Sequence, residues 1–171
     1  MSILDEIKKA LARCDLYEIG FRDLRAPDAR YRRWIYISPD IYREMRRRSS
    51  ERSFRKLSAQ FQNFLMGRTV PIALELDHKQ AQWARLDPQS DEVWECRVRQ
   101  TDPELRVVGR FASADVFIAL DLYERPELKG RKKWAQAKVR CQCRWASLFP
   151  CHPPLHGRFP HDYVRANFTV I

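Results

Sequence analysis

Three strand-like segments joined by very short turns restrict the possible folds of this chain more than any other feature of its sequence. Apolar and charged side chains alternate in residues 93–99 and again in residues 105–111, whereas residues 116–120 are continuously apolar. Alternation with a period of two is typical of a strand with one buried face, and a continuous apolar run is typical of a central strand. Because the turns between them are so short, the three segments are expected to pair as an antiparallel meander.

A helical hairpin is predicted before the meander, over residues 39–66. Ser38, Pro39 and Asp40 supply an N-cap hydroxyl, a first-turn proline and a first-turn acid. Ser49–Ser50 is a plausible break and fresh N-cap between the two helices, and Gly67 is a stop after the second. The second helix has one apolar stripe at helical spacing, formed by Phe54, Leu57, Phe61, Phe64 and Leu65.

Other elements surround the hairpin and the meander. Residues 2–13 have the apolar spacing of a short helix capped by its first serine, and residues 34–37 form a β-like run. Apolar residues at spacings of three and four predict a last helix over residues 131–148, and residues 163–171 could add an edge strand. The connection 68–91 gives mixed signals and is left without an assignment.

The order of these elements predicts one domain of the α+β class, with a helical hairpin packed on a small antiparallel sheet. An N-terminal helix and irregular arm (1–33) and a Pro/His-rich C-terminal tail (149–171) would flank the α+β core (34–148). No apolar run reaches the roughly 18 residues that a membrane helix needs, and the chain starts with acids where a signal peptide has bases. We therefore expect a soluble, cytoplasmic protein without a membrane partner.

The charge balance predicts a polyanionic partner. The chain has 32 basic and 22 acidic residues, a net charge of +10, and such an excess favours binding to nucleic acid. An arginine-rich composition also follows from a high-GC genome, so composition alone leaves both explanations open.

The basic residues concentrate between residues 25 and 55, where ten arginines face four acids. The interleaved aromatic residues, such as Trp34 and Tyr42, either stack on bases or anchor the first helix to the sheet. Either way, the charge is expected to face outward and attract phosphate. The members that we expect to bind nucleic acid are Arg32, Arg33, Arg43, Arg46 and Arg47.

Neither a metal nor another cofactor is expected. The cysteines are predicted to be reduced thiols. Cys141, Cys143, Cys151 and the nearby histidines suggest a zinc site, but Cys141 and Cys143 point about 200° apart on a helix. Asp77–His78–Lys79 faintly resembles a nuclease motif, and so short a match arises readily by chance.

The order of the central elements resembles that of the RelE/ParE toxin superfamily, including its HigB-type members. The resemblance is one of pattern and covers about residues 31–148. It is best over Glu92–Val98, followed by Leu105–Val108 and Asp115–Leu120, where a "WELR"-type strand, an "RV" strand and an apolar strand come in the family's order. It implies a toxin that is held in check by an acidic antitoxin protein.

The resemblance also implies a metal-independent endoribonuclease that cuts mRNA on the ribosome with the RNA's own 2′-hydroxyl. Carried over by position, Arg106 matches the arginine of the "RV" strand and Arg125 the basic residue after the apolar strand, and Tyr123 would be an acid/base or a stacking platform. Arg110 joins them because it shares the strand face of Arg106. The catalytic set is thus Arg106, Arg110, Tyr123 and Arg125. Residues expected to hold the RNA backbone are Arg97, Arg99, Lys129, Arg131, Lys132 and Lys133.

Two other interpretations stay open at this point. In one, the chain is a non-catalytic module of a mobile element or phage that binds nucleic acid or inhibits a host enzyme. In the other, the arginines meet acidic patches of a protein partner. For any single one of these residues, a solvated position on an exposed basic sheet face is also a sufficient explanation.

Overall fold

The computed structural model describes residues 2–20, 33–75 and 80–171. The helices are α1 (Ile3–Ala12), α2 (Pro39–Arg47), α3 (Arg52–Leu65), α4 (Arg131–Leu148) and α5 (Pro160–Tyr163), with 3-10 turns η1 (Gln89–Asp91) and η2 (Arg125–Leu128). The strands are β1 (Tyr17–Glu18), β2 (Trp34–Ile37), β3 (Val70–Ala73), β4 (Trp83–Arg85), β5 (Trp94–Val98), β6 (Leu105–Ser113), β7 (Val116–Glu124) and β8 (Phe168–Val170).

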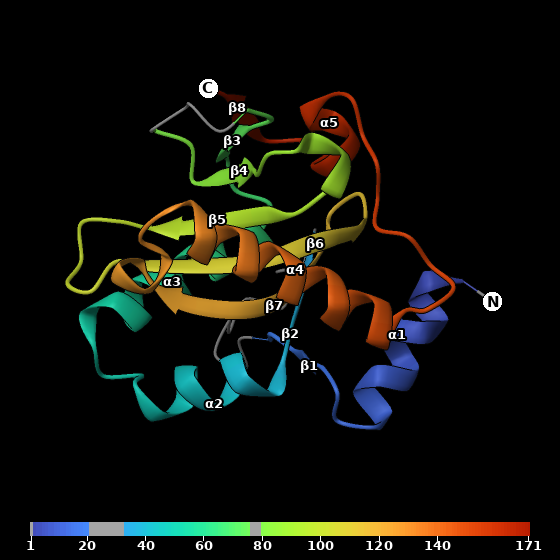
Figure 1. Ribbon diagram of the computed structural model, residues 1–171, viewed down its shortest axis with the longest axis horizontal. Helices are drawn as coiled ribbons and strands as arrows, with labels where there is room; N and C mark the ends of the chain where they lie inside the picture. The colour runs from blue at the N-terminus through green and yellow to red at the C-terminus, as the bar shows by residue number, and fades with distance from the viewer. Residues whose placement is uncertain (1, 21–32, 76–79) are drawn as a thin grey trace.

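All of these strands join one mixed sheet, in the order β1-β2-β7-β6-β5-β4-β3-β8 (Figure 1). The predicted meander β5–β6–β7 is confirmed and lies at its centre, with antiparallel pairing throughout. Strand β2 adds to β7 in parallel, and β3 is parallel to both β4 and β8. The edge strand expected near the C-terminus is confirmed as β8, although it covers only Phe168–Val170.

The prediction of a small antiparallel sheet is wrong, because the sheet has eight strands and mixed pairing. Some of the additional strands come from segments outside the predicted core, and the others come from the connection within the core that had no assignment. The connection 68–91 supplies β3 and β4, the arm supplies β1, and the tail supplies β8. An isolated meander would expose the unpaired backbone of β5 and β7 at its edges, and the neighbouring strands β4 and β2 satisfy those groups.

Two helices do form in the region predicted as a helical hairpin, α2 and α3, with one error at their junction; the predicted fold of a hairpin packed on a small antiparallel sheet is not the one observed. The Ser38 hydroxyl accepts the N–H of Ile41, as the N-cap prediction requires. The N-cap of α3 is Glu51 instead of Ser49–Ser50, and its side chain makes no capping hydrogen bond. Gly67 follows α3 with a φ of 67°, a left-handed conformation that glycine adopts at little cost.

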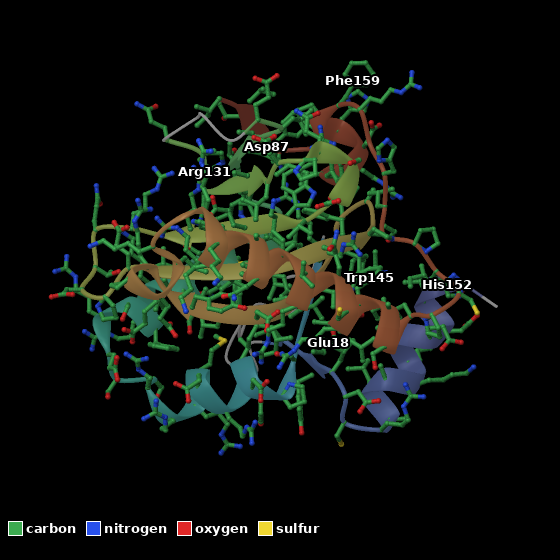
Figure 2. The ribbon with its side chains drawn as sticks, viewed as in Figure 1. Glu18, Asp87, Arg131, Trp145, His152 and Phe159 are labelled. Carbon is green, nitrogen blue, oxygen red and sulfur yellow. The ribbon has the colours of Figure 1, made fainter. Side chains whose placement is uncertain are left out.

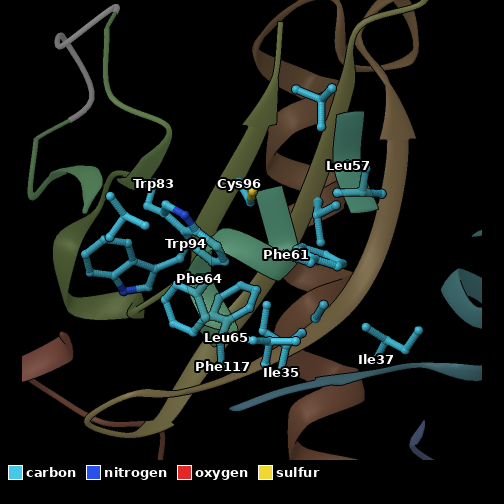
Figure 3. Packing of buried hydrophobic residues seen from close by; sticks show 14 of the residues in the cluster. Ile35, Ile37, Leu57, Phe61, Phe64, Leu65, Trp83, Trp94, Cys96 and Phe117 are labelled. Atoms are coloured by element: carbon cyan, nitrogen blue, oxygen red, sulfur yellow. The ribbon is translucent and has the colours of Figure 1, made fainter. Parts of the chain in front are cut away.

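Helices cover both faces of the sheet. On one face, α3 packs on an aromatic core in which the ring centroids of Phe64 and Trp83 are 4.7 Å apart and those of Trp83 and Phe117 are 4.8 Å apart (Figure 3). On the other face, α4 crosses the central strands (Figure 1), and Cys141 and Trp145 pack there with apolar residues of β6, β7 and α1. Side chains on both faces of the meander are therefore buried.

Candidate functional site

The expected exposed basic face of the meander is instead buried beneath α4. Arg106 and Arg110 do share a face, as predicted, but their exposed fractions are only 2% and 8%. Val108, between them on β6, packs in the same cluster as Trp145 of α4. The apolar residues of this face attract the helix, and the arginines between them are buried with it.

The arginines near the N-terminal end of α4 still reach solvent through a cavity of about 1030 Å³. We call this cavity the basic pocket. Figure 2 shows Arg131 and Asp87, two of its lining residues, while Trp145 marks the other end of α4. It is lined by Leu86, Asp87, Glu95, Arg97, Arg99, Glu104, Arg106, Arg125, Gly130, Arg131, Trp134, Ala135 and Lys138. Six cations face three carboxylates, so the lining carries a charge of +3 and favours an anionic ligand.

A buried carboxylate and two arginines form the floor of the basic pocket. Arg97 and Arg106 are directly paired across β5 and β6, and Glu95 lies two residues before Arg97, on the same face. The Nε of Arg97 donates to Oε1 of Glu95 at 2.6 Å. The Nε of Arg106 lies 3.3 Å from Oε2 of Glu95. The sheet register therefore brings opposite charges together at the pocket floor.

The Oε2 atom of Glu95 is buried and accepts no hydrogen bond within the described chain. Its ion pair with Arg106 lacks hydrogen-bond geometry, because Arg106 directs Nη1 to the carbonyl of Leu105 at 2.8 Å and Nη2 to Glu104 at 3.3 Å. Buried carboxylate oxygens normally accept hydrogen bonds. This oxygen therefore retains unused acceptor capacity at the floor of the pocket.

Further charges form the rim of the basic pocket. The side chain of Arg125 is 62% exposed, and its Nε lies 3.8 Å from Glu104 Oε2. Arg99 donates to the carbonyl of Ala81 at 2.7 Å. Burial lowers the pKa of Arg106 and of Arg99 from the ordinary arginine value. An anionic ligand that enters the pocket would offset that cost.

The N-terminus of α4 opens into the same pocket. Its N-cap, Gly130, offers no capping side chain, and its first turn contains no acid. Instead the first turn begins with Arg131, Lys132 and Lys133, at the positive end of the helix dipole. The aromatic ring of Trp134 completes the wall. These groups would hold a phosphate and a neighbouring base.

Tyr123 is adjacent to the pocket floor. It is the partner of Arg106 across β6 and β7, so that Arg97, Arg106 and Tyr123 form one row across three strands. Burial, with a contribution from Asp121, raises the pKa of Tyr123 to about 12. The phenol is therefore protonated at neutral pH and able to donate.

Arg110 lies away from this group, which corrects its place in the predicted catalytic set. Its guanidinium lies 5.6 Å from the ring centroid of Trp145 and donates to the backbone carbonyls of Asp91 and Glu92. Burial lowers its pKa. Gly109, next to it, has no room for a side chain, since an added Cβ would lie 2.1 Å from the carbonyl oxygen of Ile118. These contacts assign Arg110 to the packing of α4 on the sheet.

The arginines between residues 25 and 55 that were predicted to bind nucleic acid differ from one another in their surroundings. Arg33 is buried and donates to the carbonyl of Arg68 at 2.9 Å, so it is not on the surface as predicted. Arg43 and Arg47 form ion pairs within α2. The guanidinium of Arg46 lies over the ring of Tyr42. The predicted Arg32 lies outside the described residues, as do Arg25, Arg30 and Tyr31.

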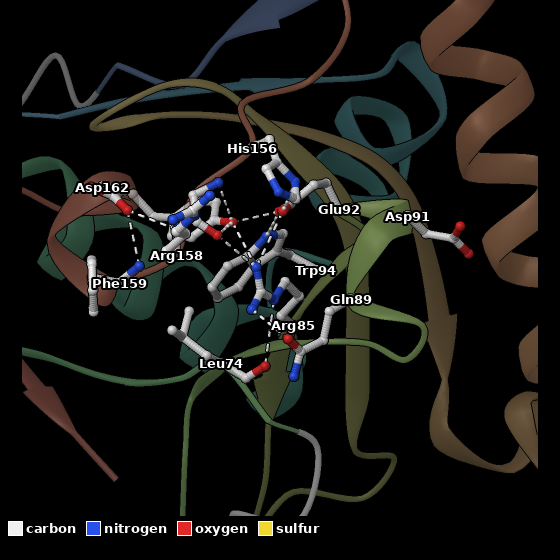
Figure 4. A network of polar contacts seen from close by, with 12 residues as sticks. Leu74, Arg85, Gln89, Asp91, Glu92, Trp94, His156, Arg158, Phe159 and Asp162 are labelled. Carbon is white, nitrogen blue, oxygen red and sulfur yellow. Dashed lines mark hydrogen bonds and ion pairs between the residues drawn. The ribbon is translucent and has the colours of Figure 1, made fainter.

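A second buried charge cluster lies near the pocket, at the other end of β5. Arg85 NH1 lies 3.1 Å from Oε1 of Glu92, and the Tyr163 hydroxyl donates to Oε2 of Glu92 at 2.6 Å (Figure 4). The side chain of His156 also contacts Glu92, with Nδ1 2.8 Å from Oε1. This cluster joins the C-terminal tail to the sheet.

Sequence reasoning missed Glu95 as a site residue. The alternation of β5 placed Glu95, Arg97 and Arg99 on one face, but that face was expected to be exposed and its glutamate received no role. The available signal was a glutamate on the same strand face as Arg97 and Arg99, next to the strand that carries Arg106.

Other groups do not add to this site. Within the described residues no set of three or more His, Cys, Asp and Glu side chains could hold a metal ion. Asp77, His78 and Lys79 lie outside that part of the chain. Likewise, no described helix is long and apolar enough to cross a membrane.

No protein-family model, curated protein or solved structure matches this chain. The resemblance to the RelE/ParE superfamily therefore stays a prediction.

Proposed function

We propose that this protein is an endoribonuclease that cleaves single-stranded RNA in the basic pocket, without a metal ion, by activating the RNA's own 2′-hydroxyl. One observation carries the proposal: Glu95, whose buried oxygen accepts no hydrogen bond from the described residues, lines a pocket of positive charge together with arginines. A carboxylate that accepts a proton and cations that bind the phosphate are two requirements of this reaction.

The roles follow from the positions of the side chains. Glu95 accepts the proton of the 2′-hydroxyl, whose oxygen forms a bond to the adjacent phosphorus. Arg106, Arg97 and Arg125 stabilise the negative charge that develops on the phosphate oxygens. The bond from phosphorus to the 5′-oxygen breaks, and that oxygen takes a proton from Tyr123, the partner of Arg106 across β6 and β7. The products are a 2′,3′-cyclic phosphate and a free 5′-hydroxyl.

The resemblance to the RelE/ParE superfamily supports the same chemistry and implies the biological setting. It implies mRNA on the ribosome as the substrate and an acidic antitoxin protein as the partner. The positive lining of the basic pocket and the uncapped N-terminus of α4 are consistent with both an RNA ligand and an acidic inhibitor.

The direct test is cleavage of a defined RNA by the purified protein, with and without ribosomes. We expect products that end in 2′,3′-cyclic phosphate, and no cleavage at a site where a single nucleotide is replaced by its 2′-deoxy form. Glu95→Gln should reduce the rate by about 10²–10⁴-fold. Cleavage at the 2′-deoxy site would exclude the mechanism.

Two arginines provide a matched pair for the same assay. Arg125 lines the pocket, whereas Arg55 is an exposed arginine on α3 outside it. Arg125→Ala should reduce cleavage and relieve the growth arrest expected on expression in bacteria, as should Arg106→Ala, whereas Arg55→Ala should do neither. Equal effects of Arg125→Ala and Arg55→Ala would mean that only the overall charge matters.

The alternative of a non-catalytic binding module has its own support in the unneutralised cations at the start of α4. It predicts RNA binding that weakens steeply with salt while the RNA stays intact. Binding without cleavage in that assay would reject the endoribonuclease and support the non-catalytic binding module.

A further inference from the structure

A second basic hollow lies beside the first turns of α4. It has a volume of about 490 Å³ and is lined by residues of β7, η2 and α4. We call it the lysine hollow, after Lys129 and Lys133; Tyr123, Gln136 and Arg140 also line it. None of these five residues lines the basic pocket.

The lysine hollow has cations that the protein itself does not neutralise. Arg140 is engaged by Asp121, with its Nε 2.8 Å from Oδ1. The carboxylate of Glu127 accepts the backbone N–H of Glu124 at 2.5 Å. In the described part of the chain, by contrast, neither Lys129 nor Lys133 has an ion-pair partner. Two ammonium groups are therefore available to a ligand.

The first turn of α4 separates the two cavities. Arg131 lines the basic pocket and Lys133 the lysine hollow, and residues two apart on a helix point about 200° apart. A cation at a helix N-terminus is unfavourable, because it lies at the positive end of the helix dipole. No acidic side chain of the first turn offsets that repulsion. A polyanion that lies across this turn would offset the repulsion.

We propose that the lysine hollow binds a second phosphate of the RNA strand whose scissile phosphate lies in the basic pocket. The strand then crosses the N-terminal turn of α4. Lys129 and Lys133 bind the second phosphate. This inference rests on the proposed function for the strand's position in the basic pocket, and it adds a binding site that the cleavage chemistry does not require.

An aromatic ring in each cavity favours a single strand. Trp134 lines the basic pocket and Tyr123 the lysine hollow. Unpaired bases stack on such rings, whereas the bases of a duplex are already stacked and paired. Tyr123, in the strand row beside Arg106, lies where it would contact the nucleotides between the two phosphates.

The test is the binding of uncleavable 2′-O-methyl oligonucleotides, measured by fluorescence anisotropy. A dinucleotide has one internucleotide phosphate and reaches only one cavity, whereas a hexanucleotide reaches both. Combining Lys129→Ala with Lys133→Ala should weaken hexanucleotide binding about tenfold and lower the slope of log Kd against log salt by about 1.4, the value for two lost contacts to a single strand. Dinucleotide binding should not change.

The matched control combines Lys8→Ala with Lys9→Ala on α1, which removes the same charge at exposed positions that line neither cavity. It should leave binding of both oligonucleotides unchanged. The second site would be overturned if the Lys129/Lys133 variant lost affinity equally for the dinucleotide and the hexanucleotide. It would also be overturned if the control variant lost as much affinity for the hexanucleotide as the Lys129/Lys133 variant. A wild-type protein that binds neither oligonucleotide would overturn it as well.

The cleavage assay separates this failure from failure of the proposed function. If wild-type protein cleaves RNA but the Lys129/Lys133 variant has an unchanged KM for long substrates, the second site is wrong and the enzyme survives. If length-dependent binding depends on both lysines but no RNA is cleaved, the site is supported and the catalytic role of the basic pocket fails. A DNA hexanucleotide that binds as tightly as the RNA analogue would reject RNA as the specific ligand.

Discussion

Two buried glutamates only three residues apart, Glu92 and Glu95, have opposite surroundings. Glu92 is enclosed by protein groups from three parts of the chain: Arg85, Trp94 and Tyr163 all donate to its carboxylate (Figure 4). The carboxylate of Glu95 forms ion pairs with Arg97 and Arg106, and one of its oxygens has no hydrogen bond within the described chain.

The difference indicates what each carboxylate does. In the cluster around Glu92 the charged and polar groups satisfy one another and join the tail to the sheet, so the cluster contributes to fold specificity. In the cluster around Glu95 unused acceptor capacity lines a cavity. A buried charge that the protein leaves incompletely satisfied is a candidate for chemistry.

The largest effect on stability is expected for Glu92→Gln. The substitution leaves the buried Arg85 without a counter-charge. Removing one partner of a buried ion pair costs about 3–5 kcal/mol. Urea denaturation should show this loss in the free energy of unfolding, with the exposed Glu18→Gln as the control. A loss below about 1 kcal/mol would mean that the cluster is not a structural one.

The same chemical change at Glu95 should affect catalysis more than stability. We expect Glu95→Gln to lower the free energy of unfolding by about 1–3 kcal/mol, because Arg106 keeps a second carboxylate partner in Glu104. The cleavage rate should fall by about 10²–10⁴-fold. Denaturation and single-turnover kinetics on both glutamine variants measure the contrast directly. If Glu92→Gln reduces cleavage as strongly under conditions where it is folded, the two clusters do not differ in function.

Two tyrosines repeat the comparison with a smaller change. Tyr163→Phe removes a hydroxyl that donates to Glu92 and accepts the N–H of Gly157, and should cost about 1–3 kcal/mol of stability. Burial raises the pKa of Tyr163, so the change removes a neutral phenol and no charge at neutral pH. Tyr123→Phe should instead slow cleavage by about 10²-fold with little loss of stability. Thermal unfolding and cleavage rates of both variants decide whether the roles separate in this way.

The smallest effect is expected for a surface ion pair, which provides a reference for the buried clusters. Arg144 of α4 donates to Asp40 of α2, and this hydrogen bond is the main reason why the pKa of Asp40 is lowered. A carboxyl with a folded-state pKa below its unfolded value contributes stability above the unfolded pKa, and the contribution is lost as the pH falls through the folded pKa. Because the pair is partly exposed, the contribution should stay below about 1 kcal/mol.

Stability measured against pH checks this expectation. Asp40→Asn should reduce stability slightly at neutral pH and flatten its decline on the acid side, below the unfolded carboxyl pKa of about 3.9. If Asp40→Asn lowered the free energy of unfolding at neutral pH as much as Glu92→Gln, solvent exposure would not explain the difference expected between the two ion pairs.

Much of the local structure was predictable because its causes are local. The cap at Ser38, the stripe of α3 and the alternation in β5 and β6 depend on residues a few positions apart, and all three were predicted correctly. The strands of the 68–91 connection were not assigned, since β3 and β4 are short and their pairing partners lie elsewhere in the sequence. Two members of the predicted catalytic set, Arg106 and Arg125, do line one cavity.

The sequence by itself determined which residues share a strand face, where α2 begins and that the meander pairs with itself. Only the tertiary structure decided that α4 covers the face of Arg106 and Arg110, that the sheet extends to eight strands, and that Glu95 meets two arginines in a cavity. The physical reason is that periodicity specifies the direction of a side chain, whereas burial depends on which distant segment packs against it. The free energy of that packing comes from contacts between residues far apart in the sequence.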